Sequence, residues 1–233
     1  MKRIFPPLIA FILLLPAIVF AAAPSSVKAT YEMYRNNILF AQIEETYTAE
    51  NGKYQIDSIA NPAGMLTLIS KDRITRLSKG TITQQGLRPE FFEEKRTGGD
   101  KEKIRSASFD WANQKIALSF DGKTETAALE PGTQDWGSLF YQFLFITPKK
   151  ENVKVTIADG KKVESYLFRF TDEMNVTTDA GKFETLHYAR SDDKGERKTE
   201  IWLAKQKSFF PVRLVQEEDG KVLEQRLVAL SLN

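Results

Sequence analysis

The chain has 233 residues, no cysteine and a single histidine, so neither disulfides nor the usual cysteine and histidine cages around a transition metal can form. Its 33 Lys and Arg residues face 31 Asp and Glu residues, which leaves a net charge of only +2. This mixed and nearly neutral charge argues against a nucleic-acid partner, whose phosphates require a basic patch, and against a polybasic membrane-binding stretch.

The N-terminus predicts export from a bacterial cytoplasm. Lys2 and Arg3 precede an apolar core at 8–20, and Ala21 is a small residue of the kind found at signal cleavage sites. We therefore expect a signal peptide over residues 1–21, cleavage after Ala21 and a mature protein in the periplasm. The alternative is an uncleaved segment that anchors the chain to the inner membrane, because a membrane span needs about 20 apolar residues.

The mature chain is expected to form one domain. Residues 22–30 are predicted to be a short flexible lead, and residues 31–233 a single β-rich domain with one apolar core. The two cations of the signal account for the whole net charge, so the mature chain is formally neutral.

Short turn signals separate the strand-like runs of this domain. Asn-Gly and Asp-Gly pairs tolerate the positive φ angles that tight hairpins need. The predicted turns are Asn51-Gly52, Asp121-Gly122, Asp159-Gly160, Asp179-Ala180-Gly181, Lys194-Gly195 and Asp219-Gly220. Between them apolar residues alternate, as at Ile116, Leu118 and Phe120, which indicates strands with one buried face. Ile201 and Leu203 share a face with Trp202 opposite, so this strand is apolar on both faces.

One segment breaks the β pattern with a helical stripe. Trp136, Leu139, Phe140 and Phe143 follow a spacing of three and four residues, which predicts a helix over Asp135–Phe145 that Thr133 or Asp135 could cap. A second, weaker helix is expected over Asn61–Ile69. The predicted fold is mainly β, with at least eight strands in a curved antiparallel sheet or half-barrel. One or two helices would pack on its concave face, where the four stripe residues are the expected cavity lining.

No catalytic motif stands out. His187 lies in an alternating strand, where a lone histidine is usually structural, and no nucleophile elbow accompanies it. The carboxylate clusters, such as Glu93 and Glu94, lie beside charged and turn residues that favour a solvated surface. We therefore expect neither enzymatic activity nor a cofactor or metal.

The order of several short motifs resembles an uncharacterised family of exported bacterial proteins, domain of unknown function thirty-one-zero-eight. The matching pieces are Ser78-Lys79-Gly80, Gly86-Leu87-Arg88-Pro89, Phe109-Asp110-Trp111, Gln134-Asp135-Trp136-Gly137-Ser138-Leu139, Gly181-Lys182-Phe183-Glu184-Thr185-Leu186, Ile201-Trp202-Leu203-Ala204 and Phe210-Pro211-Val212-Arg213. The resemblance spans residues 30–230 and implies no functional residue, because the family has no established activity.

The final strands also look like the last hairpins of periplasmic lipoprotein carriers, which are half-barrels around a hydrophobic cavity. The residues concerned are Trp202-Leu203, Pro211-Val212-Arg213 and Asp219-Gly220. This likeness implies an envelope protein that binds a lipid, an acyl chain or another apolar ligand. The alternative is a structural or assembly factor with a solid core that binds another envelope protein through its surface. In either case no nucleic acid is expected as a partner, and the membrane only transiently if the signal is cleaved.

Overall fold

The computed structural model describes residues 24–99, 101–191 and 197–233, which form one antiparallel sheet of fourteen strands in the order β8-β7-β6-β5-β4-β3-β2-β1-β14-β13-β12-β11-β10-β9. Alternating apolar and polar residues produce this sheet, because each strand can then bury one face. The strands are β1 (Ser26–Arg35), β2 (Ile38–Glu50), β3 (Lys53–Pro62), β4 (Arg73–Thr83), β5 (Gly86–Thr97), β6 (Lys103–Asp110), β7 (Lys115–Phe120), β8 (Lys123–Ala128), β9 (Val153–Ala158), β10 (Val163–Thr178), β11 (Gly181–Ser191), β12 (Arg197–Ala204), β13 (Phe210–Glu218) and β14 (Lys221–Leu232).

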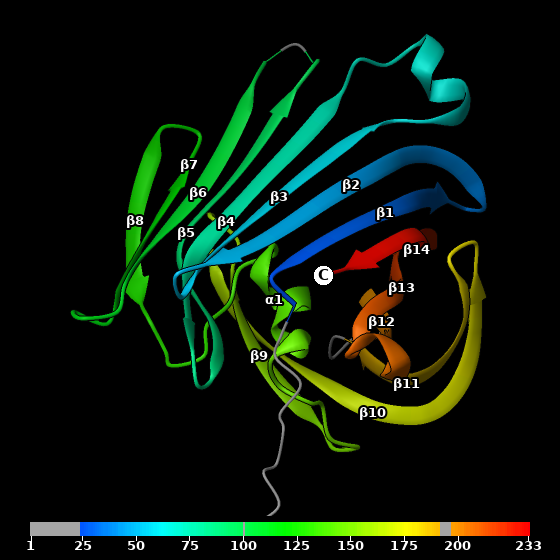
Figure 1. The fold of residues 1–233 in the computed structure, drawn as a ribbon. Coiled ribbons are helices and arrows are strands. Elements are labelled where there is room, and N and C mark those ends of the chain that lie inside the picture. The colour runs from blue at the N-terminus through cyan, green and yellow to red at the C-terminus, as the bar shows by residue number, and fades with distance from the viewer. Residues whose placement is uncertain (1–23, 100, 192–196) are drawn as a thin grey trace, which may run out of the picture.

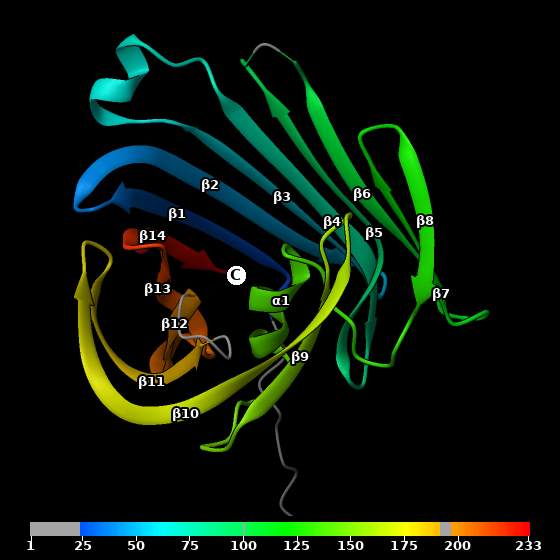
Figure 2. The ribbon, with the colours of Figure 1, turned by 180° about the vertical axis from the view of Figure 1, so that it is seen from behind.

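The first and last strands meet in the middle of the sheet. β1 pairs with β2 on one side and with β14 on the other, so the two edges of the sheet are β8 and β9. The sheet curls strongly, and the segment 129–152 that joins its two edges carries helix α1 (Ser138–Tyr141) into the concavity (Figure 1; Figure 2). The predicted curved sheet with a helix on its concave face is confirmed.

Five of the six predicted turns join neighbouring strands. Asn51 and Gly52 both have positive φ, of 51° and 74°, and Asp219 and Gly220 repeat this geometry at 51° and 72°. The other three join β7 to β8, β9 to β10, and β10 to β11. Lys194-Gly195 lies outside the described residues.

The stretch 22–30, expected as a flexible lead, contains the first five residues of β1 instead. Val27 is fully buried, Ser26 to Thr30 pair with β2, and Val27 to Thr30 also pair with β14. The prediction was wrong for these residues because one of their two partner strands, β14, lies about 200 positions further along the chain and leaves no local signal.

The helix expected over Asp135–Phe145 is shorter than predicted. A first turn begins where the Leu139 N–H donates to the Asp135 carbonyl at 3.0 Å, and α1 then continues as a 3₁₀ turn, η2 (Gln142–Leu144). The change of helix type coincides with Gln142, whose side chain is held by the β4–β5 turn. Its amide group donates to the Gln85 carbonyl at 2.9 Å and accepts from the Leu87 N–H at 2.6 Å.

The second helix, expected over Asn61–Ile69, is also reduced. β3 extends to Pro62, and only a 3₁₀ turn, η1 (Gly64–Leu68), follows it. Gly64 has a φ of 61°, in the left-handed region, so a right-handed helix cannot run through it. A third short 3₁₀ turn, η3 (Lys205–Lys207), links β12 to β13.

The concave face is packed at one end of the strands and open at the other. On β1, Tyr31 is buried whereas Met33 and Arg35 line a cavity; on β2, Tyr47 is buried whereas Ala41 lines it. We call the packed end the filled half: Val27, Ala29, Tyr31, Tyr47, Ile56, Tyr141 and Leu227. We call the open end the hollow half: Met33, Arg35, Ala41, Ile74, Arg76, Arg96, Arg105, Leu214, Gln216, Leu223 and Gln225.

Candidate ligand-binding site

The helical segment is fixed to the sheet by one buried carboxylate. Asp135 Oδ1 accepts the N–H groups of Gly137 at 2.7 Å and Ser138 at 2.9 Å, while the Asp135 N–H donates to Ser138 Oγ at 3.0 Å. This reciprocal pair is a capping box. Asp135 Oδ2 also accepts from Ser78 Oγ on β4 at 2.7 Å, so the start of the helix is held against the sheet. Of the two predicted capping residues, Asp135 takes the role.

Burial makes this carboxylate unusually basic. Loss of hydration raises the pKa of Asp135 to about 6, although hydrogen bonds from Ser138, Ser78 and Gly137 favour its charged form. No cation is among these partners. The helix start therefore carries a buried negative charge above that pH and a neutral group below it.

The structure brings all four predicted lining residues to one small apolar pocket. Trp136, Leu139, Phe140 and Phe143 form its helical wall. The sheet side consists of Val153, Val155, Phe168, Tyr188, Thr199, Ile201 and Leu214. The pocket has a volume of only ≈ 30 Å³, which is room for about one small molecule of the size of water.

A much larger cavity of ≈ 610 Å³ occupies the hollow half. It shares Trp136, Phe140 and Leu214 with the small pocket, so the two spaces are separated by these three side chains. Leu139 and Phe143 do not line the larger cavity. Of the four residues predicted to line a cavity, only Trp136 and Phe140 therefore face the larger space.

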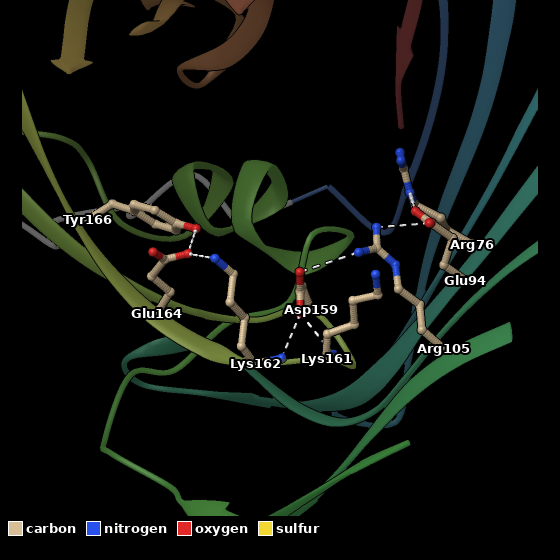
Figure 3. A network of polar contacts seen from close by, with 8 residues as sticks. All are labelled: Arg76, Glu94, Arg105, Asp159, Lys161, Lys162, Glu164 and Tyr166. Atoms are coloured by element: carbon tan, nitrogen blue, oxygen red, sulfur yellow. Dashed lines mark hydrogen bonds and ion pairs between the residues drawn. The ribbon is translucent and has the colours of Figure 1, made fainter. Parts of the chain in front are cut away.

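One wall of the larger cavity is polar and rich in arginine. Arg76 Nε lies 2.6 Å from Glu94 Oε2, and an Arg105 nitrogen lies 2.8 Å from Glu94 Oε1, so one carboxylate pairs with two guanidinium groups (Figure 3). Burial alone would raise the pKa of Glu94, but Arg76 and Arg105 outweigh it and the pKa is lowered. Arg96 pairs with Asp72 at 2.5 Å. Most of the positive charge of this wall is thus compensated within the protein.

The same network joins the two wings of the sheet. Arg105 on β6 also lies 3.3 Å from Asp159 in the β9–β10 turn, although β6 and β9 are far apart in the strand order (Figure 3). The backbones are close here as well, since a Cβ at Gly160 would lie 2.8 Å from the Ser106 nitrogen. This contact places the β9–β10 turn against β6, on the side opposite to the central strands of the sheet.

Sequence reasoning did not identify the arginine wall. Glu94 was interpreted as solvated surface because of the charged residues around it, and Arg96 was not singled out. The available signal was their spacing: both lie at even-numbered positions after Phe92, which is fully buried, and therefore on the concave face of β5.

The single histidine lies away from both cavities. His187 on β11 is largely buried, stacks on Trp202 with 4.4 Å between ring centroids, and places Nδ1 3.2 Å from an Asp172 carboxylate oxygen. Within the described parts of the chain, no group of three or more His, Asp or Glu side chains is arranged to hold a metal ion. No helix of the described residues is long and apolar enough to span a membrane.

The chain matches a known protein family and is similar to solved structures. A family model described as "Protein of unknown function (DUF3108)" matches residues 30–223. The crystal structure of a β-barrel-like protein of domain of unknown function DUF1849 from Brucella abortus covers 91% of this chain and 100% of its own, with 11% identity and a TM-score of 0.57. The crystal structure of "a putative lipoprotein from Parabacteroides distasonis" covers 89% of this chain and 95% of its own, with 11% identity and a TM-score of 0.36. Among curated proteins none matches significantly.

Proposed function

Because the chain belongs to this family of proteins of unknown function, we propose from its own geometry that it is a non-catalytic binding protein of the cell envelope. The hollow half would hold an apolar ligand, such as a lipid or an acyl chain. The observation that carries the proposal is the ≈ 610 Å³ cavity beside the aromatic helical segment. Its volume lies within the range of about 300–1,000 Å³ that is typical of small-molecule sites.

The lining of the cavity supports an amphipathic ligand. Trp136, Phe140 and Leu214 present apolar surface, whereas Arg76 and Arg105 lie on the polar wall. An acyl chain would gain about 25 cal/mol for each Å² of apolar surface that leaves water. Its polar end would be directed toward the arginine wall, where the buried Nε of Arg105 has no hydrogen-bond partner.

The small apolar pocket suits the far end of such a chain. Its lining residues are mostly apolar, and only Trp136, Phe140 and Leu214 separate it from the main cavity. At ≈ 30 Å³ it cannot take a chain without rearrangement, so entry of a longer ligand would require these side chains to change rotamer.

The test is binding of a fluorescent fatty acid to the purified mature chain, together with native mass spectrometry for co-purified lipid. Leu214→Trp would add bulk where the two spaces meet, and we expect it to weaken probe binding by at least roughly tenfold because the site is partly filled. Leu167→Trp is the matched control, because Leu167 is 43% exposed on β10 and lines neither cavity.

If the wild-type protein binds no probe and carries no lipid, the ligand-binding proposal fails. The alternative of an envelope structural or assembly factor would then take its place. Equal weakening by Leu214→Trp and Leu167→Trp would also contradict the site, because the effect would not be specific to the cavity.

A further inference from the structure

The most exposed large apolar side chains of the described residues gather at one short turn. Leu68, Met65 and Ile69, on or directly after η1, are 84%, 83% and 82% exposed, and Ile38 is 69% exposed. Single exposed apolar residues are normal on proteins, whereas a cluster of four marks an interaction site. We call these four residues the rim patch.

The backbone contacts of η1 bring the rim patch together at the mouth of the cavity. The Ala63 N–H donates to the Phe40 carbonyl at 2.9 Å, and a Cβ at Gly64 would lie 2.9 Å from the Leu39 carbonyl oxygen. Ile38 therefore lies next to η1. Leu66, in the same turn, faces the other way and lines the large cavity. In Figure 1 this turn is the cyan coil that projects beyond the ends of β3 and β4.

The turn is well formed without its apolar side chains. The N–H groups of Ile69 and Ser70 donate to the Leu66 carbonyl at 3.1 and 2.9 Å, and Thr67 Oγ1 donates to the Gly64 carbonyl at 2.9 Å. None of these bonds uses the side chains of the rim patch, which pack against little of the protein. Their apolar character is therefore not explained by folding.

Positive charge borders the rim patch. Lys71 and Arg73 follow η1 directly and are exposed. The β5–β6 connection, which brings the exposed Lys101 and Lys103, packs beside them, since a Cβ at Gly98 would lie only 2.0 Å from the Lys71 carbonyl oxygen. Among the described residues of this region, Asp72 is paired with Arg96 and Glu102 with Lys95.

We propose that the rim patch docks the protein onto an anionic lipid bilayer. Met65, Leu68 and Ile69 would enter the headgroup region, while Lys71 and Arg73 contact lipid phosphates. A bilayer fits better than a protein partner, because the apolar side chains stand on a small projecting turn with cations beside it, not on a flat surface. Through Leu66 the docked surface is continuous with the cavity lining. The docking itself does not require that the cavity hold a ligand.

The experiment is co-sedimentation with vesicles of phosphatidylethanolamine and phosphatidylglycerol, and with vesicles of phosphatidylcholine alone. The protein used begins at Pro24, because the N-terminal apolar run would bind vesicles by itself and every described element lies after it. We expect binding to the anionic vesicles that weakens with added salt and is weaker on phosphatidylcholine.

Two matched pairs of variants test the assignment. Leu68→Asp should reduce the partition coefficient by roughly tenfold or more, because it places a charge where an apolar side chain would enter the interface. Leu167→Asp, the same change on exposed β10, should not. Lys71→Glu should weaken binding, whereas Lys53→Glu at the opposite end of β3 should leave it unchanged.

Unchanged binding by Leu68→Asp, or equal loss in both members of a pair, would overturn the proposal, as would absence of binding by the wild-type protein. Leu68 is 84% exposed, so its variant is expected to keep the wild-type circular dichroism and melting curve, which distinguishes lost docking from lost folding. The fatty-acid probe is measured without vesicles, so failure of either proposal leaves the other testable.

Discussion

The filled half and the hollow half of the concave face lie on the same strands but differ in how their side chains pack. In the filled half, Tyr47 and Tyr141 stack at 5.4 Å between ring centroids, and Phe210 meets Tyr141 edge-on at 5.4 Å. In the hollow half several lining positions carry small or charged residues, such as Ala41 on β2 and Arg76 on β4. The comparison suggests that one end of the half-barrel supplies stability, while the other can remain open because it contributes less to it.

The largest expected effect is a difference in the free energy of unfolding between two alanine variants of helix α1, one in each half. Tyr141→Ala should lower the free energy of unfolding by about 4 kcal/mol, since it removes a fully buried ring and leaves a cavity. Phe140→Ala, one position earlier, should cost about half as much, because Phe140 already borders empty space.

Urea denaturation, with fluorescence and circular dichroism as two probes, measures both values. Tyr141→Phe serves as a control that keeps the ring and removes only the hydroxyl bonded to Glu45 at 3.2 Å. Equal losses for the two alanine variants would mean that the hollow half is packed as tightly as the filled half.

An intermediate effect concerns the buried carboxylate that fixes the helix. The folded-state pKa of Asp135, about 6, is above its ordinary value of 3.8. The folded state therefore binds more protons in this window, and the contribution of Asp135 to stability falls as the pH rises from about 4 to about 6.

Asp135→Asn keeps the cap but cannot ionise, so it provides the reference for this group. We expect the stability of the wild type relative to the variant to be greater at pH 4 than at pH 7, by on the order of 2 kcal/mol. Urea titrations at both pH values check this. Glu94 has a lowered pKa, so its contribution to stability is lost as the pH falls, which is the opposite trend. Because Glu94 is present in both proteins, the difference in stability between the wild type and Asp135→Asn removes most of this trend. A constant difference would contradict the raised pKa.

The smallest expected effect is a loss of stability in two turns, and it should be the same in the filled half and in the hollow half. Gly52 and Gly220 occupy tight turns at opposite ends of the strands, with φ of 74° and 72°, and a Cβ at either position meets nothing within 4 Å. Gly52→Val and Gly220→Val should each cost about 1.5 kcal/mol from left-handed strain alone. Thermal unfolding compares them, and clearly unequal losses would show that the turns are coupled to the packing of their own half.

Local signals explain what the sequence could predict. The turn at Asp219-Gly220 follows from backbone preferences of two adjacent residues, and the helical stripe at Trp136 from spacing within one segment. The length of the helix was overestimated, and the α-helical part ends just before Gln142, whose side chain contacts the β4–β5 turn in a distant part of the chain. The hollow half could not be predicted, because it depends on which strand lies opposite which, and the pairing of β1 with β14 has no local signature.

That central pairing also affects how the chain reaches its fold. Strands β1 to β8 form one series of hairpins and strands β9 to β14 form another, and each strand pairs with its neighbour in the sequence. Such local pairings form quickly. The seam between β1 and β14 joins residues as distant as Val27 and Leu232, so it has the highest contact order in the sheet. Until it forms, each meander exposes a long edge strand that can pair with another chain. Slow refolding and a tendency of the half-folded chain to aggregate through the unpaired edge of β1 are therefore expected of this topology.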